Sequence, residues 1–191
     1  RGEYNCFLNV IVQALWHVET FRSKLLEAPN DEPLVRALQS IFSDLAASHA
    51  AGTDTQVSPE SLRQILASDF RLGDMADACE LFEALLHKLK TSGGADAAGV
   101  FEASLVDPPA NPGEPQPQPY QTFVLYGSVA TMREVSNRNK PFEELLRLVT
   151  GQSGSNAAAG AERRKVCLGP LPHVFTLGLA WDSARPSKEA L

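Results

Sequence analysis

The feature of this 191-residue sequence that most limits its fold is a proline-rich segment, residues 107–119, with six prolines in thirteen positions. Proline lacks a backbone N–H and fixes its own φ angle, so this segment cannot pair as a central strand and is expected to be extended and mobile. A solvated spacer is favoured over a docking site for a proline-binding partner. We therefore expect three regions: residues 1–90, a low-complexity, proline-rich insert at 91–119, and residues 120–191.

The first region is predicted to be helical because its apolar residues recur every three or four positions. Leu8, Val12 and Leu15, for example, fall on one face of a helix. Ser58-Pro59-Glu60 offers an N-cap, a proline in the first turn and an acidic residue, which together are typical of a helix start. The predicted helices cover residues 6–26, 31–47, 58–66 and 77–89.

The region after the insert is predicted to be mixed. Residues 123–126 form an apolar run typical of a strand, and residues 174–181 show strand-like alternation at Phe175, Leu177 and Leu179. A short helix is expected at 141–149. Helices followed by strands predict an α+β fold.

Charge and cysteine content exclude several classes of protein. Seventeen Lys+Arg against 23 Asp+Glu give a net charge of −6, whereas nucleic-acid binders gather basic residues on one face, so no nucleic-acid partner is expected. No apolar run reaches the roughly 18–20 residues that span a bilayer, so no membrane partner is expected either. Cys6, Cys79 and Cys167 form no CxxC pair, which predicts reduced thiols in an intracellular protein, no Cys-based zinc site and no cofactor.

Cys6 is the first candidate for chemistry because it stands where a loop becomes an amphipathic helix. Amide N–H groups at the start of a helix, together with the helix dipole, stabilise a thiolate. Such a thiol acts as a nucleophile when a His lies within hydrogen-bond distance as general base. The alternative interpretation is that Cys6 is a small buried apolar residue. If Cys6 is the nucleophile, its sulfur is expected to project into a groove that admits an extended peptide. Cys79, in contrast, is expected inside a helix, on or near the packed face.

Three short blocks stand out along the chain. The blocks are Asn5-Cys6-Phe7-Leu8-Asn9 followed by Gln13-Ala14-Leu15; Met75-Ala76-Asp77-Ala78-Cys79-Glu80; and Leu171-Pro172-His173-Val174-Phe175-Thr176-Leu177-Gly178-Leu179-Ala180-Trp181-Asp182. The first resembles the Cys box of the ubiquitin-specific proteases, the papain-like deubiquitinases. The second resembles the Asp-Ala-x-Glu helix of that family, and the third its palm strand. In detail they are similar to the divergent branch called ubiquitin carboxyl-terminal hydrolase-related.

This resemblance implies a papain-like cysteine protease fold. Residues 1–90 would be a helical thumb that carries the Cys box, and residues 120–191 would be partial, strand-rich fingers and palm. Cys6 would be the nucleophile, and Asn5 beside it a candidate oxyanion residue. The implied partner is ubiquitin or a ubiquitinated protein in the cytoplasm or nucleus.

The resemblance also implies roles for four other residues. Asn9 and Gln13 are expected to bind the substrate. Asp77 and Glu80 are expected to be a structural motif, in which a first-turn carboxylate caps its own helix.

Several features of the family pattern are missing from the sequence. The family's triad His lies in a Gly-His-Tyr-like box, and none of the four histidines here is followed by Tyr. His17, His49, His87 and His173 are each interpreted as surface or boundary residues. Residues 91–165 contain no Cys, so the zinc-binding pairs of many family members are absent. We expect a piece of a longer protein that stops before the His box and is inactive by itself.

Three hypotheses follow from these matches and departures. The first is the N-terminal part of a cysteine-type deubiquitinase, whose intact parent hydrolyses isopeptide bonds at the ubiquitin C-terminus. The second is a catalytically inactive ubiquitin-binding or scaffolding pseudo-deubiquitinase, favoured by the missing zinc ligands and by Met75 or Ala76 where the family has Gln. The third is an unrelated α+β domain with chance matches, which requires Cys6 to be buried.

Overall fold

A computed structural model describes residues 5–53, 56–71, 74, 76–106, 118–134, 139–145, 166–167 and 170–180. The chain divides into two compact units, Arg1–Val100 and Phe101–Leu191. Each unit is described by itself below. The described residues form helices in the first unit and short strands with further helical turns in the second, so the predicted α+β class is confirmed.

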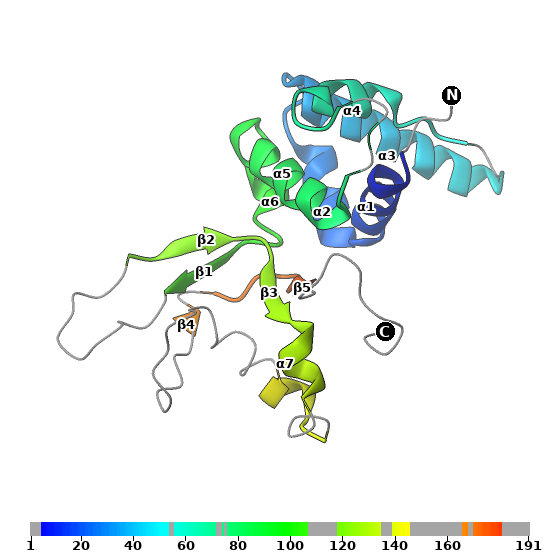
Figure 1. Cartoon of the computed structure of the whole chain (residues 1–191). Coiled ribbons are helices and arrows are strands. Elements are labelled where there is room, and N and C mark those ends of the chain that lie inside the picture. The colour runs from blue at the N-terminus through cyan, green and yellow to red at the C-terminus, as the bar shows by residue number, and fades with distance from the viewer. Residues whose placement is uncertain are drawn as a thin grey trace. The chain divides into compact units, whose positions relative to one another are not determined.

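The first unit is built from helices packed on one another (Figure 1). In chain order they are α1 (Cys6–His17), α2 (Glu19–Glu27), α3 (Pro33–Ala51), α4 (Glu60–Ile65), the 3-10 turn η1 (Leu66–Ser68), α5 (Ala78–Thr91) and α6 (Ala95–Ala98). α1 packs on α2 and α5, and α3 packs on α2, α4 and α5. Within the described part of the chain, no helix is both long and apolar enough to span a membrane.

The sequence predicts one helix over residues 6–26, and the structure corrects this to two. The break lies at Val18, whose φ of −85° and ψ of 94° are extended. At about 100° per residue, Phe21 would lie roughly 140° and Leu25 roughly 100° around a continuous helix from Leu8. The break turns α2 so that all three side chains are fully buried.

Side chains stabilise both sides of this break. The guanidinium of Arg22 donates a 2.8 Å hydrogen bond to the carbonyl of Trp16 in the last turn of α1, and it lies 4.5 Å from the centre of the Trp16 ring. At the end of α2, the amide of Gln39 donates to the carbonyls of Leu25 and Ala28 at 2.9 and 2.8 Å. The carbonyls of Trp16 and Ala28 thereby gain side-chain partners, and the carbonyl of Leu25 gains a second partner besides the main-chain N–H of Ala28.

The other predicted helices are present with shifted ends. α3 begins at Pro33 as expected but continues to Ala51, four residues beyond the predicted end, so His49 lies in its last turn and not in a loop. It stops at Gly52, whose φ of 61° is the left-handed conformation that glycine adopts readily. α4 begins at Glu60, one residue later than predicted, with Pro59 as N-cap.

The core of the first unit is formed by side chains from all of its described helices, including the turn η1 and the short helix α6. Phe21 and Phe42 contact each other edge to face, with ring centroids 6.2 Å apart, and Trp16 contacts Phe42 in the same way at 5.5 Å. The largest fully buried side chains, besides these two phenylalanines, are Leu8, Leu15, Leu25, Leu38, Leu62, Leu66, Leu81, Leu85, Leu86 and Leu89. This core fixes the position of α1, on which the candidate nucleophile lies.

The second unit contains two small sheets. In the first, β1 (Ala103–Val106) is the central strand and pairs antiparallel with β2 (Tyr120–Thr122) and β4 (Val166–Cys167). Both α6 and β1 fall inside the predicted insert at 91–119, so the first part of that range has regular structure. The side chains of β1 alternate between buried and half-buried, with Ala103 and Leu105 inside, as expected for a strand with one face on a core. Residues 107–117 lie outside the described residues.

The second sheet joins β3 (Leu125–Ser128) in parallel to β5 (Leu177–Ala180). Both predicted strands are therefore present, β3 two residues later and β5 three residues later than their predicted starts. Gly178 leaves room for its neighbours at the pairing, because a Cβ there would lie 2.7 Å from the Tyr126 ring and 2.9 Å from the Val124 side chain, and one of these would have to shift. α7 (Val129–Arg133) follows β3 and was not predicted.

The remaining predictions for this unit are tested only in part. Residues 142–145 are helical, within the helix predicted at 141–149, and residues 146–149 lie outside the described residues. The Trp181-Asp182 end of the third block also lies outside them.

Candidate functional site

Cys6 is the first residue of α1 and has an exposed, free thiol. This position agrees with the predicted helix start and contradicts the alternative that Cys6 is buried. The main-chain N–H of Asn9 donates a 2.9 Å hydrogen bond to the carbonyl of Asn5, which closes the first turn of the helix. The side chain of Asn5 makes no capping hydrogen bond to α1.

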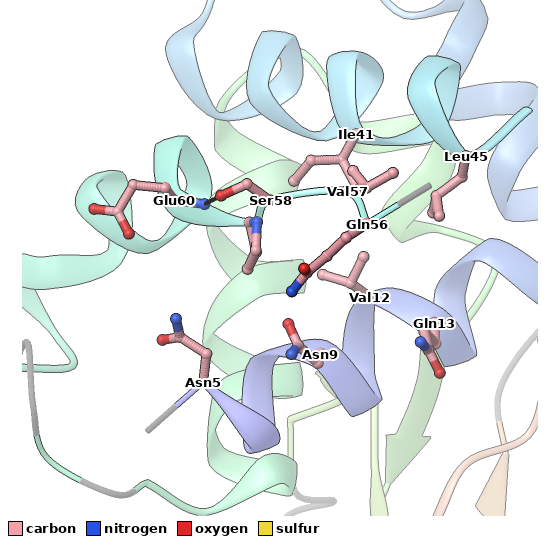
Figure 2. A pocket seen from close by; sticks show the side chains of 11 residues that line it. Asn5, Asn9, Val12, Gln13, Ile41, Leu45, Gln56, Val57, Ser58 and Glu60 are labelled. Atoms are coloured by element: carbon pink, nitrogen blue, oxygen red, sulfur yellow. Dashed lines mark hydrogen bonds between the residues drawn. The ribbon is translucent and has the colours of Figure 1, made fainter. Parts of the chain in front are cut away.

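A cleft of about 750 Å³ lies against the same helix. Asn5, Asn9 and Gln13 line it from one side, because residues four positions apart share a helix face. The segment 56–60 lines the opposite side, and Figure 2 shows Asn9 and Gln56 pointing toward one another across the cleft. The apolar part of the lining comes from Val12, Ile41, Leu45, Val57 and Pro59.

The cleft is lined mainly by groups that form hydrogen bonds. Amide side chains both donate and accept, as do the peptide groups of an extended chain, and Glu60 adds a carboxylate. The structure brings together three of the residues predicted to act near the nucleophile, namely Asn5, Asn9 and Gln13. What Asn9 and Gln13 bind stays a prediction. The sequence also places Cys6 in a groove, but Cys6 is not among the residues that line this cleft.

Sequence reasoning missed the wall of the cleft opposite α1. Ser58 and Glu60 are predicted only as part of a helix start, no role is predicted for Gln56, and nothing in the spacing of these residues relates them to the Cys box. Arg63 is also buried, which was not predicted, although its spacing from an apolar residue indicates this. It precedes Leu66 by three residues and so shares the buried face of that turn.

Asp77 has the structural role that the sequence predicts. Its carboxylate accepts hydrogen bonds from the main-chain N–H groups of Cys79 and Glu80, at 2.7 and 3.1 Å, and so caps α5. Glu80 lies exposed in the first turn, where a negative charge is favoured by the helix dipole. The second block is thus a helix start.

Cys79 differs from its predicted environment. The sequence places it on or near the packed face of its helix, but it is exposed, because the buried positions of α5 begin at Leu81. Partial loss of hydration raises the pKa of the Cys79 thiol, and the carboxylates of Asp77 and Glu83 raise it further. The helix start does not activate this thiol, since the Asp77 carboxylate occupies the amide groups there.

The four histidines are exposed, as the sequence predicts. His17 ends α1, eleven residues after Cys6, or about 16 Å along the helix axis, which is too far for a hydrogen bond to the thiol. His87 lies in α5, and His173 precedes β5 in the second unit. Among the described residues, no three His, Cys, Asp or Glu side chains are grouped to hold a metal ion.

The comparison with known protein families decides what kind of domain this is. A family model described as "Ubiquitin carboxyl-terminal hydrolase" matches residues 2–188, which is nearly the whole chain. The chain belongs to this family. Membership in the ubiquitin carboxyl-terminal hydrolase family confirms the resemblance seen in the three blocks and, with the mixed helices and sheets, the papain-like α+β class.

Curated relatives of the chain belong to the same family and are distant. Ubiquitin carboxyl-terminal hydrolase 53 of Homo sapiens is 28% identical over 222 residues, which cover 95% of this chain and 20% of that protein. Ubiquitin carboxyl-terminal hydrolase 54 of Mus musculus is 26% identical over 222 residues, covering 95% and 14%. The chain therefore spans a fifth or less of the length of these relatives.

Proposed function

We propose that the protein containing this chain is a cysteine-type deubiquitinase in which Cys6 is the nucleophile. The observation that carries the proposal is the exposed thiol at the first residue of α1, in a chain that the family model matches over residues 2–188. The substrate is the isopeptide bond between the ubiquitin C-terminus and a lysine of another protein. Such substrates place the activity inside the cell.

The proposed reaction proceeds by acyl transfer. The Cys6 sulfur, as a thiolate, attacks the carbonyl carbon of the last ubiquitin residue and forms a C–S bond. The C–N bond to the lysine breaks as a general acid protonates the departing amine, and water then hydrolyses the thioester. None of the four histidines stands in the Gly-His-Tyr-like box of the family, so we place the acid–base His in a part of the protein outside this chain.

The amide side chains beside Cys6 have a defined role in this proposal. Asn5 and Asn9 stand at the start of α1 and line the cleft together with Gln13. Amide groups hold an extended peptide by pairing with its main-chain N–H and C=O groups. We propose that Asn9 and Gln13 contact substrate and that Asn5 donates to the developing oxyanion.

A second candidate function is a ubiquitin-binding module without catalysis. It is favoured by the lack of cysteine in residues 91–165 and by Met75 or Ala76 at the position where the family carries Gln. In this case ubiquitin binds, but the thiol performs no chemistry.

The test is covalent labelling of the intact protein with ubiquitin that carries a C-terminal electrophile. We expect one adduct with the wild-type protein, the same adduct with Cys79→Ser, and none with Cys6→Ser. Calorimetric titration with unmodified ubiquitin is run in parallel. No Cys6-dependent adduct, with ubiquitin binding retained, would establish the second function, and loss of both adduct and binding would exclude both.

A further inference from the structure

Arg63 is a charged residue in the interior of the first unit. Its side chain is only 2% exposed, and among the described residues no Asp or Glu forms an ion pair with it. A buried charge is costly unless hydrogen bonds compensate it. Arg63 is therefore expected to make contacts that an apolar residue of similar size would not provide.

The guanidinium of Arg63 holds the chain that follows η1. One terminal nitrogen donates a 2.6 Å hydrogen bond to the carbonyl of Phe70, and the other donates to the carbonyl of Arg71. Two donors of one rigid, planar group thus fix two consecutive carbonyls. A lysine has a single charged nitrogen and cannot reproduce this fork.

The same guanidinium also contacts the residue next to the candidate nucleophile. Its central carbon lies 5.3 Å from the centre of the Phe7 ring, within the range of a cation–π contact. Phe7 and Phe70 contact each other as well, with ring centroids 6.2 Å apart, and both are at least nine-tenths buried. Arg63, Phe7 and Phe70 form one cluster beneath the first turn of α1.

The cluster also reaches the cleft through α4. The main-chain N–H of Arg63 donates a 2.9 Å hydrogen bond to the carbonyl of Pro59, and Pro59 and Glu60 line the cleft opposite Asn5 and Asn9. One side of the cleft and the start of α1 are therefore connected through a single buried residue.

We propose that Arg63 is a positioning residue, which acts through Phe7 to hold the first turn of α1 and with it the Cys6 thiol. The part of this inference that concerns catalysis rests on the proposed function, whereas the part that concerns the first turn of α1 does not. The contact with Phe7 restricts the residue that directly follows Cys6, and the bonds to residues 70 and 71 fix the support on which Phe7 rests. Without the guanidinium, the first turn opens more often while the rest of the helix stays in place.

Amide hydrogen exchange of the full chain tests the structural part. The Asn9 amide reports on the first turn because its N–H bonds to the carbonyl of Asn5. We expect Arg63→Met to speed its exchange by about tenfold relative to amides in the middle of α3, and Arg63→Lys by less. Arg36→Met is the matched control, since Arg36 also donates to two carbonyls, those of Asn30 and Asp31, but is exposed. The control should leave Asn9 unchanged.

Labelling of the intact protein with the ubiquitin electrophile tests the catalytic part. We expect Arg63→Met to lower the maximal rate of adduct formation by about tenfold while the half-saturating probe concentration stays unchanged, with Arg63→Lys in between. Unchanged exchange at Asn9 in Arg63→Met, or an equal rise at Asn9 and in α3, overturns the positioning role. Faster exchange at Asn9 together with no adduct in the wild type keeps the structural role and rejects the proposed function.

Discussion

Two cysteines of the first unit stand at helix starts and have different surroundings. Cys6 is the first residue of α1, where the side chain of Asn5 forms no cap. Cys79 is the second residue of α5, where the carboxylate of Asp77 accepts its main-chain N–H. The surroundings of the two thiols therefore differ, because α5 has the Asp77 carboxylate at its start, whereas the first turn of α1 contains no acidic residue.

The chemistry of Cys79 gives a prediction at this scale. Lost hydration and the carboxylates of Asp77 and Glu83 raise the pKa of the Cys79 thiol above its usual 9.0, so less thiolate is present at pH 7.5. Glu83→Gln removes one of these charges without touching the cap, so the pKa falls and more thiolate forms. We expect the rate of Cys79 alkylation by iodoacetamide to rise about two- to fivefold.

Peptide mass spectrometry resolves Cys79 from the other cysteines in this experiment. Glu19→Gln, which removes a charge from the first turn of α2, is the control and should leave the rate unchanged. The difference between Glu83→Gln and wild type should disappear at a pH above the raised pKa, where both thiols are ionised. Equal rates of Cys79 alkylation in Glu83→Gln and the wild type at pH 7.5 would show that the Glu83 carboxylate does not raise the pKa of this thiol.

At the scale of elements, helix ends are determined by local chemistry in some places and by packing in others. α5 begins where Asp77 caps it, and α3 ends where Gly52 adopts a positive φ. The break between α1 and α2 has no Gly or Pro. It follows from the need to bury Leu8 and Phe21, which a straight helix would place on different sides.

The cap of α5 gives a prediction at the scale of the element. Asp77→Ala removes the acceptor of two main-chain N–H groups and should lower the free energy of unfolding by about 1 kcal/mol. Asp77→Asn keeps an oxygen acceptor at the same place and should lose only a few tenths of a kcal/mol. Urea denaturation followed by circular dichroism measures both. An alanine variant as stable as the asparagine variant would show that the cap is not stabilising.

At the scale of the whole molecule, the described structure is two compact units with different sources of order. The first has a continuous core of leucines and aromatic rings contributed by its helices. The second has short paired strands, with Phe123 and Val124 buried just before β3. The candidate nucleophile belongs to the first unit, so its position depends on that core.

The core of the first unit gives a prediction about stability. Leu8 is fully buried in α1, whereas Val10 on the same helix is 59% exposed. Leu8→Ala should lower the free energy of unfolding by about 2–5 kcal/mol, because it removes buried apolar contacts and leaves a cavity. Val10→Ala, the control, should change it by less than about 0.5 kcal/mol. Equal losses in urea denaturation would show that α1 is not anchored by this face.

Much of the site was predictable because it depends on local sequence. Cys6 at a helix start, Asp77 as a cap and the exposed histidines follow from signals within a few residues. Cys79 was wrongly predicted because helical spacing locates a face but does not say which neighbouring residues cover it. The roles of Asn9 and Gln13 rest on resemblance alone and stay predictions.

The sequence by itself determined the family, the helical first half and the residue types at the start of α1, because periodicity, caps and motif blocks are local properties of the chain. Only the tertiary structure decided that the first helix divides at Val18, that the segment 56–60 faces Asn9 across a cleft, and that Arg63 lies under Phe7. The cleft and the Arg63–Phe7 contact join residues about 45 to 55 positions apart in the sequence. The break at Val18 depends on which helix faces are buried in the core. Such contacts are selected by packing, which no local pattern encodes.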